Sequence, residues 1–251
     1  MVIKFSKEYF ISHSHKDEEA HGLLLKKLRN RGIEPYIYSP NKGSPTNLAS
    51  KDLIEAILDH LALVHIQNGF PEQSFWVAFE RDYALRAHKP VYAFDPVTYK
   101  IEKSRIPPLN LPIYPSYYSG DKEKMHNLFT FMRNRHFDLN SFFKIEGSTA
   151  TSFTESFNTV IRNGGYYAIF LSSKTLKTKN LKEEIGFALK SHPDRILIGL
   201  LDQFNLKDIP GNLDRIQCVQ LFGDRKRSEI ERWDDLIVNL YWLVLKSTHK
   251  L

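Results

Sequence analysis

The chain has 251 residues, of which 42% are hydrophobic and 25% are charged, with 12 Gly and 12 Pro. This ordinary globular composition excludes a collagen, a low-complexity disordered chain and a long coiled coil. The formal charge of +6 comes from basic residues scattered among acidic ones, which favours a solvated surface over a nucleic-acid groove.

The start of the chain and its apolar runs predict neither a secretory signal nor a membrane span. The first ten residues hold no long apolar stretch followed by a small-residue cleavage site. The strongest candidate for a membrane span, residues 236–245, is shorter than the roughly 18 apolar residues that a span needs. Cys218 is the single cysteine and cannot form an internal disulfide, which fits a reducing compartment. We therefore expect a soluble cytoplasmic protein without membrane contacts.

Strands and helices are expected to alternate along the first part of the chain. The run Arg29-Asn30-Arg31-Gly32 is a helix stop signal. The alternation predicts an α/β fold, with a parallel sheet and helices on both faces. In chain order the expected elements are a strand at 9–11, a helix at 17–31, a strand at 33–38, a Pro/Gly/Ser loop at 40–45, a helix at 53–58, a strand at 61–66, a helix at 76–87 and a strand at 91–94.

The chain repeats itself at an offset of 104 residues. Arg29-Asn30-Arg31 recurs as Arg133-Asn134-Arg135, and fourteen positions between residues 10 and 90 are identical to their partners at this offset. Chance would give roughly four such identities, at about one in twenty. We therefore interpret the chain as a tandem duplication with a first domain at 1–106, a Pro-rich linker at 107–112 and a second domain at 113–251, in which only the second has room for a long final helix at 228–246.

Two segments of the first copy carry recognisable motifs. Phe10-Ile11-Ser12-His13-Ser14 is a strand that ends in an aromatic-Ile-Ser-polar turn and leads into an acidic helix start. Ser74-Phe75-Trp76-Val77-Ala78-Phe79-Glu80 places Trp76 four residues before Glu80 at the head of a helix. In the second copy, Leu171-Ser172-Ser173 and Glu184-Ile185-Gly186-Phe187-Ala188-Leu189 follow the matching strand and helix patterns. In these motifs and in their order the chain resembles Toll/interleukin-1 receptor (TIR) domains, over nearly its whole length. The resemblance implies two flavodoxin-like TIR domains.

Many bacterial TIR domains cleave NAD, so the resemblance implies an enzyme that breaks the nicotinamide–ribose bond. The ADP-ribose would be released, cyclised or transferred to make a nucleotide signal in antiphage defence. A carboxylate beside the ribose would stabilise the positive charge that develops there. By the resemblance this residue is Glu80, with Glu184 of the second copy as the alternative. NAD is then the substrate, and no resident cofactor is expected. The residues implied in binding it are Phe10, Ser12, His13, Ser14, Gly43, Ser44 and Trp76.

The second copy departs from these motifs. Asn180 replaces Trp76, and the segment 115–118, which begins with Pro115, replaces 11–14. We therefore interpret the second copy as a degenerate partner rather than a second active site. Active TIR assemblies build a site between two domains, so the loop around Gly147-Ser148, or that of another chain, is expected to complete the pocket of Glu80.

Two alternative interpretations of the sequence assign the chain to other functional classes. His13-x-His15-x-Asp17 superficially resembles the metal box of metallo-β-lactamase-like hydrolases. Glu18 stands where the third ligand of that box should be, so no metal site is predicted. The stronger alternative is a non-enzymatic TIR scaffold or adaptor that works by protein–protein assembly. Self-association through TIR surfaces and a sensor or effector protein are the partners that the resemblance implies.

Overall fold

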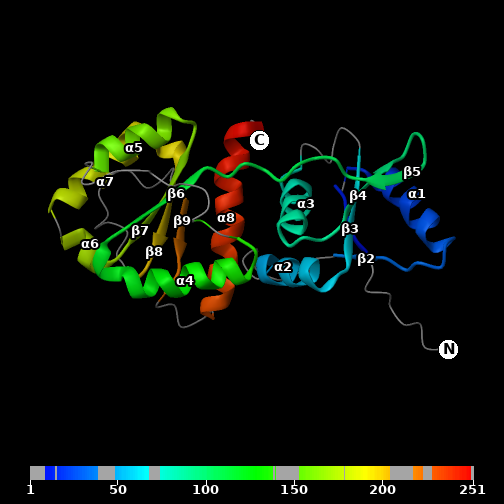
Figure 1. The fold of residues 1–251 in the computed structure, drawn as a ribbon, viewed down its shortest axis with the longest axis horizontal. Helices are drawn as coiled ribbons and strands as arrows, with labels where there is room; N and C mark the ends of the chain where they lie inside the picture. Colours follow the sequence, from blue (N-terminus) through cyan, green and yellow to red (C-terminus); the bar gives the residue numbers. More distant parts are fainter. Residues whose placement is uncertain are drawn as a thin grey trace. The chain divides into compact units, whose positions relative to one another are not determined.

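The computed structural model describes residues 9–14, 16–38, 49–67, 74–137, 139, 153–177, 179–203, 217–222 and 228–249. The chain divides into two compact units, residues 1–109 and residues 110–251, called here the first and second unit. The boundary between the units falls inside the Pro-rich segment 107–112. Each unit is an α/β structure, with a sheet that carries helices on both faces (Figure 1).

The first unit contains eight regular elements. They are β1 (Tyr9–Ser12), α1 (Glu18–Arg29), β2 (Tyr36–Ile37), α2 (Ala49–Asp59), β3 (Ala62–Ile66), α3 (Phe75–Arg86), β4 (Val91–Asp95) and β5 (Lys100–Lys103) among the described residues. The sheet has the order β2-β1-β3-β4-β5, in which the first four strands are parallel and β5 runs antiparallel to β4. This order is consistent with a flavodoxin-like fold, whose connections change direction between β1 and β3.

The two faces of the first sheet are covered by different helices, as Figure 1 shows for α1 on one side and α2 and α3 on the other. Leu24 and Leu28 of α1 form a buried cluster with Ile11, Val64 and Phe94 of the strands. Side chains alternate along a strand, so the neighbours of Ile11 and Val64 point to the opposite face. That face packs against α3, which contacts β1, β3 and β4.

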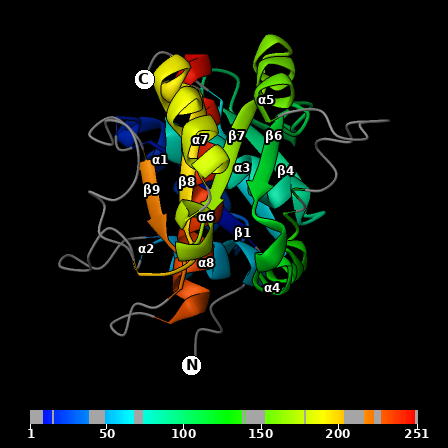
Figure 2. The same cartoon turned by 90° about the vertical axis from the view of Figure 1, so that its left-hand side faces the viewer.

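The second unit repeats this arrangement with a fully parallel sheet. Its strands have the order β6-β7-β8-β9, and Figure 2 shows them side by side with α7 in front. β6, β7 and β8 begin 104 or 105 residues after β1, β3 and β4. The described elements are β6 (Ile113–Tyr117), α4 (Lys122–Asn134), α5 (Phe153–Arg162), β7 (Tyr166–Leu171), α6 (Ser173–Lys177), α7 (Lys179–Ser191), β8 (Ile196–Leu200), β9 (Gln217–Gln220) and α8 (Glu229–His249), with short 3-10 turns at Ser119–Asp121 and Pro193–Arg195.

Helices α5 and α7 cover one face of the second sheet, and α4 and α8 lie on the other. Phe157 of α5 and Ile185 of α7 share a buried cluster with Ile169 and Ile198 of the strands. α8 contacts α4 and the strands β7, β8 and β9. The predicted final helix at 228–246 is therefore confirmed, and it supplies a layer that no described segment of the first unit provides.

The predicted α/β fold and parallel strand pairing are confirmed, with two differences. The strand expected at 33–38 is reduced to Tyr36–Ile37. Pro35 lacks an N–H and cannot donate to the ladder, so pairing begins after it. The sequence patterns also did not predict β5, which turns back on β4 because the Asp95 carboxylate accepts the N–H groups of Val97 at 2.8 Å and Thr98 at 3.3 Å. Among the described residues, no helix is long and apolar enough to cross a membrane.

Both copies of the Arg-Asn-Arg segment end a helix in the same way. After α1, the N–H of Ile33 donates to the carbonyl of Leu28 at 3.1 Å, and after α4 the N–H of Phe137 donates to Met132 at 2.8 Å. Gly32 has a φ of +75°, and the equivalent residue, His136, has a φ of +59°. This left-handed turn satisfies the last carbonyls of each helix. The repeat in sequence is thus also a repeat in backbone geometry.

We predict opposite effects for the same substitution at two glycines near each other in the first unit. A Cβ would meet no atom within 4 Å at either Gly22 or Gly32, but only Gly32 has a positive φ. Gly22→Ala, inside α1, should raise the free energy of unfolding by about 0.5–1 kcal/mol. Gly32→Ala should lower it by about 1–2 kcal/mol, because a side chain is strained there. Urea denaturation of both variants measures this, and equal shifts of the same sign would contradict the described helix end.

Candidate functional site

Polar side chains gather at the carboxyl edge of the first sheet, where β1 and β3 end. Ser12 is the last residue of β1 and pairs in register with His65 of β3. On its other side, the pairing of Ile11 with Ile37 brings Tyr38 next to Ser12. This edge lies at the change of connection direction between β1 and β3, where open α/β sheets bind ligands.

Helix α3 places a carboxyl group directly over this edge. Ser12 Oγ donates a hydrogen bond to Glu80 Oε2 at 2.5 Å, and Ser12 and Glu80 are 1% and 8% exposed. Nine of the twelve residues of α3 are buried, including Glu80, Arg81 and Asp82. A helix surrounded on so many sides turns polar residues into the protein, so Glu80 points at the strand end rather than at solvent. The structure thus brings together two residues that the sequence motifs named separately.

Burial controls the ionisation of Glu80. Loss of solvation raises the pKa of its carboxyl group to about 8, and the hydrogen bond from Ser12 acts in the opposite direction. In the protein alone, Glu80 is therefore protonated at neutral pH. A carboxyl group of this kind becomes a carboxylate when a positive charge approaches it.

Tyr38 is a member of the site that the sequence motifs did not indicate. Burial raises the pKa of its phenol to about 12, with further contributions from the negative charges of Asp52, Tyr36 and Glu80. Its position follows from the register of β2 on β1, which was not evident while the strand was expected to extend over 33–38. An aromatic residue at the last position of that expected strand was the signal available in the sequence.

His65 and Arg81 were also not predicted as site residues, because His65 lies within an apolar strand and Arg81 belongs to no motif. His65 is 2% exposed and Arg81 is 8% exposed. The pKa of His65 is lowered to about 4, mainly by burial and also by the charge of Arg81, while a hydrogen bond to the Ile66 backbone opposes both. Glu80 thus bonds to Ser12 of β1, and the charge of the next residue, Arg81, acts on His65 of β3.

The turn after β1 is built from the remaining motif residues. The carbonyl of Ser14 accepts the N–H of Asp17 at 3.0 Å, and Ser14 Oγ accepts the N–H of Lys16 at 3.3 Å. The rings of His13 and His21 stack with centroids 3.8 Å apart and planes 10° apart.

The described part of the chain contains no group of three His, Cys, Asp or Glu side chains that could hold a metal ion. His15, which belonged to the alternative metal box, lies outside the described residues.

The two aromatic residues of the motifs have different environments. Phe10 is buried, with its ring 5.9 Å from the rings of both Tyr36 and His60. Trp76 is 44% exposed and lies one helical turn before Glu80. Its ring therefore has a free surface on the helix that carries the carboxyl group. The predicted binding residues Gly43 and Ser44 lie outside the described residues, as do Gly147 and Ser148 of the second copy.

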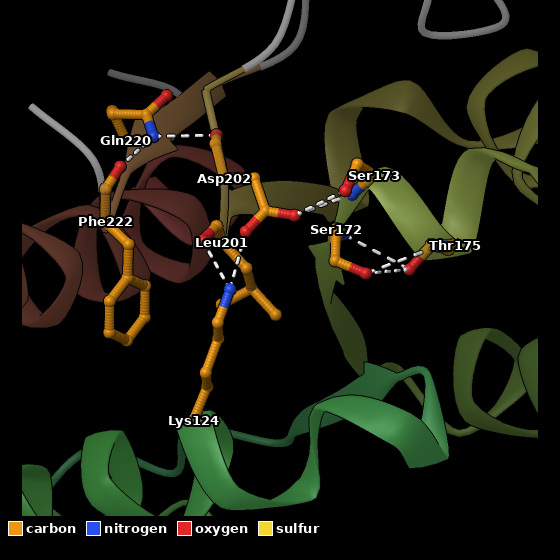
Figure 3. Close-up of polar contacts among 8 residues, drawn as sticks. All are labelled: Lys124, Ser172, Ser173, Thr175, Leu201, Asp202, Gln220 and Phe222. Carbon is orange, nitrogen blue, oxygen red and sulfur yellow. Dashed lines mark hydrogen bonds and ion pairs between the residues drawn. The ribbon is translucent and has the colours of Figure 1, made fainter.

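The corresponding edge of the second sheet carries a network of hydrogen bonds, drawn in Figure 3. The Asp202 carboxylate accepts bonds from Lys124 Nζ at 2.5 Å, from the N–H of Ser173 at 2.8 Å and from Ser173 Oγ at 2.9 Å. Gln220 Nε2 donates to the carbonyls of Asp202 and Phe222. Both oxygens of the Asp202 carboxylate and the amide of Gln220 thus have protein partners, whereas the hydrogen bond described above for the Glu80 carboxyl comes from Ser12 to Oε2.

The second unit offers no described counterpart of the Ser12–Glu80 pair. Ser116, the partner of Ser12 at the repeat offset, lies in β6 next to Pro115 and pairs in register with Ile169. Pro115 lacks the N–H that a strand ladder uses, and β6 lies at the edge of the described sheet, where proline is tolerated. The side chain of Glu184, the alternative catalytic residue, is outside the described part of the chain.

Comparisons of the chain with protein-family models, with curated proteins and with solved structures found no match.

The raised pKa of Glu80 predicts a pH-dependent stability difference between the protein and its Glu80→Gln variant. Below pH 4.5, Glu80 is protonated in both folded and unfolded chains, so it adds no pH dependence. Between pH 4.5 and about 8 the unfolded carboxyl ionises while the buried one does not, which destabilises the folded protein progressively as the pH rises. Gln cannot ionise, so Glu80→Gln should gain in melting temperature relative to the original chain from pH 5 to pH 8.5.

Thermal unfolding of both chains at a series of pH values measures this difference, and Glu102→Gln serves as an exposed control on β5. The other titrating groups are shared by the compared chains and cancel. A constant difference across the pH range would show that Glu80 has an ordinary pKa in the folded protein.

Proposed function

We propose that the chain is a TIR-like enzyme that cleaves NAD at the nicotinamide–ribose bond, with Glu80 as its catalytic carboxylate. One observation carries the proposal. Glu80, which resembles the TIR catalytic glutamate, is buried at the carboxyl edge of the first sheet. It accepts a hydrogen bond from Ser12, a residue of the other TIR-like motif. Two motifs separated by 68 residues in the chain thus meet at one point. The flavodoxin-like order of the first sheet supports the same assignment.

The proposed reaction requires one negative charge beside the ribose. The bond between the ribose carbon and the pyridinium nitrogen breaks, and its electron pair goes to the ring, which leaves as neutral nicotinamide. The ribose becomes an oxocarbenium-like cation, which the carboxylate of Glu80 would stabilise. A water molecule, or a hydroxyl or nitrogen nucleophile in a cyclisation or transfer, then bonds to that carbon and releases a proton.

The protonation state of Glu80 bears directly on this chemistry. In the protein alone the carboxyl group is neutral near pH 7, because its pKa is about 8. The positive pyridinium ring of NAD would favour the charged form, so binding of the substrate would release a proton from Glu80. The hydrogen bond from Ser12 stabilises the same charged form.

For the second unit we propose a role as partner rather than as a second catalytic centre. The polar groups at its sheet edge are occupied by the Lys124–Asp202–Ser173 network, and Pro115 and Asn180 depart from the motifs of the first copy. A function in bacterial antiphage immunity, with release of a nucleotide signal, follows from the TIR resemblance and is part of the proposal.

The exposure of Trp76 favours a second candidate function, a TIR-like scaffold that acts by assembly. A tryptophan that is 44% exposed on a helix whose other residues are mostly buried is an anchor typical of protein interfaces. In that case the Ser12–Glu80 bond would be a structural tie between β1 and α3, without turnover.

The experiment that separates the two functions is NAD consumption by the purified chain, with products resolved by mass spectrometry. We expect Glu80→Gln to abolish turnover, whereas Glu184→Gln and the exposed control Glu102→Gln keep it. Loss of turnover in Glu184→Gln alone would move the catalytic site to the second copy. Absence of turnover in the original chain, also at concentrations that favour assembly, would favour the scaffold.

We also predict the pH profile of the proposed reaction. The value of kcat/KM should rise with pH as Glu80 ionises in the free enzyme, with its half-point near pH 8. In Ser12→Ala the half-point should move to higher pH, because the hydrogen bond from Ser12 lowers the pKa of Glu80. An unchanged half-point in Ser12→Ala would contradict the coupling between these two residues.

A further inference from the structure

A second acceptor of hydrogen bonds lies beside the Ser12–Glu80 pair. His65 Nε2 is buried and has no hydrogen-bond partner among the described residues. Buried polar atoms are usually satisfied, so an orphaned one requires an explanation. Its position at the end of β3, in register with Ser12, puts it at the same point as Glu80, where the direction of the strand connections changes.

The chemistry of the ring nitrogen follows from its surroundings. The ring forms a hydrogen bond to the backbone of Ile66, and since Nε2 has no partner, this bond belongs to Nδ1. In a neutral ring with its proton on Nδ1, Nε2 carries a lone pair and can only accept. Arg81, the charged neighbour from α3, keeps the ring neutral and would repel a cationic donor. The group best suited to Nε2 is therefore a neutral hydroxyl or amide.

The register neighbours of His65 on the sheet both have small side chains. On one side Ser12 already donates to Glu80 at 2.5 Å, and on the other the register partner is Ala93, whose side chain is a single methyl group. Two acceptors, the Glu80 carboxyl from α3 and the His65 imidazole from β3, thus flank one serine at the edge of the sheet. A cis-diol presents two neutral donors on adjacent carbons and matches such a pair.

We propose that His65 is a ligand-binding residue of the Glu80 site, and that its Nε2 accepts a hydrogen bond from one hydroxyl of the nicotinamide ribose while Glu80 accepts from the other. This inference rests on the proposed function, which supplies the ribose. It adds a specificity for the intact diol that the Glu80 assignment alone does not require. His65 is then a binding residue and takes no part in breaking the bond.

The first test uses steady-state kinetics on the full chain with His65→Leu and His65→Gln. Leu removes the acceptor, so KM for NAD should rise roughly two- to tenfold with little change in kcat, in line with one net hydrogen bond. Gln keeps an acceptor oxygen and should restore part of this loss. His60→Gln removes another buried histidine, which packs on Phe10 and Tyr36, and should leave KM unchanged. An NAD analogue without one hydroxyl on the nicotinamide ribose should lose affinity for the original chain but not for His65→Leu.

The second test does not depend on turnover. In a protein labelled with nitrogen-15 histidine, the Nε2 resonance of His65, assigned by its loss in His65→Gln, should shift when the NAD analogue with an intact diol but no cleavable bond is added. Turnover of NAD without this shift, or equal KM values for His65→Leu and the original chain, would overturn the role of His65 and leave the proposed function standing. Absence of both turnover and shift would reject both. A shift without turnover would keep the binding role of His65 and reject the enzymatic assignment.

Discussion

The hydrogen bond between Ser12 and Glu80 is the interaction on which the account of the first unit depends. It links the end of a central strand to a helix that is buried on most of its surface, and it holds a carboxyl group where solvent cannot stabilise its charge. The geometry of the fold makes such a contact available, because β1 and β3 end side by side where the direction of the strand connections changes. Burial then determines the chemistry, since a carboxyl group with a pKa of about 8 responds to a nearby positive charge within the neutral pH range.

The position of Glu80 is fixed by contacts farther along the same helix. Asp82 is 1% exposed and forms an ion pair with Arg86 at 2.7 Å, and its other oxygen accepts the backbone N–H of Leu109. Arg86 also donates to the carbonyl of Leu109 at 2.5 Å. These two side chains tie the segment after β5 to α3. The helix is therefore held against the strands by Glu80 and against the end of the first unit by Asp82 and Arg86, which limits how far the carboxyl group can shift.

The two copies show how one arrangement of elements can carry different polar edges. In the first unit, Ser12 and Glu80 form one hydrogen-bonded pair, and His65 and Tyr38 lie nearby. In the second unit, Lys124 forms an ion pair with Asp202 and Ser173 donates a hydrogen bond to it, so the carboxylate at the corresponding edge already has partners. The repeat in strand starts and helix ends is thus kept, while the chemistry at the strand ends differs.

Much of the fold followed from sequence, because apolar periodicity and the internal repeat both report on packing. The helix stop at Arg29-Asn30-Arg31 and the buried strand at 61–66 are local patterns, and the structure confirms both. β5 depends instead on a turn closed by the side chain of Asp95, and β2 is shortened by Pro35, effects that periodicity does not capture. For the site, the motifs indicated Ser12 and Glu80 but could not show that they touch. His65, Tyr38 and Arg81 belong to the same edge through strand register and helix rotation, which a linear pattern does not contain.

The most direct test of the central claim is a carbon-13 NMR titration of the Glu80 side-chain carboxyl, assigned with Glu80→Gln, in the absence and presence of a non-cleavable NAD analogue. We predict a midpoint near pH 8 for the protein alone and a clearly lower midpoint with the analogue bound, because the pyridinium charge favours the carboxylate. A midpoint near 4.5 in the protein alone, or one that the analogue leaves unchanged, would contradict this claim.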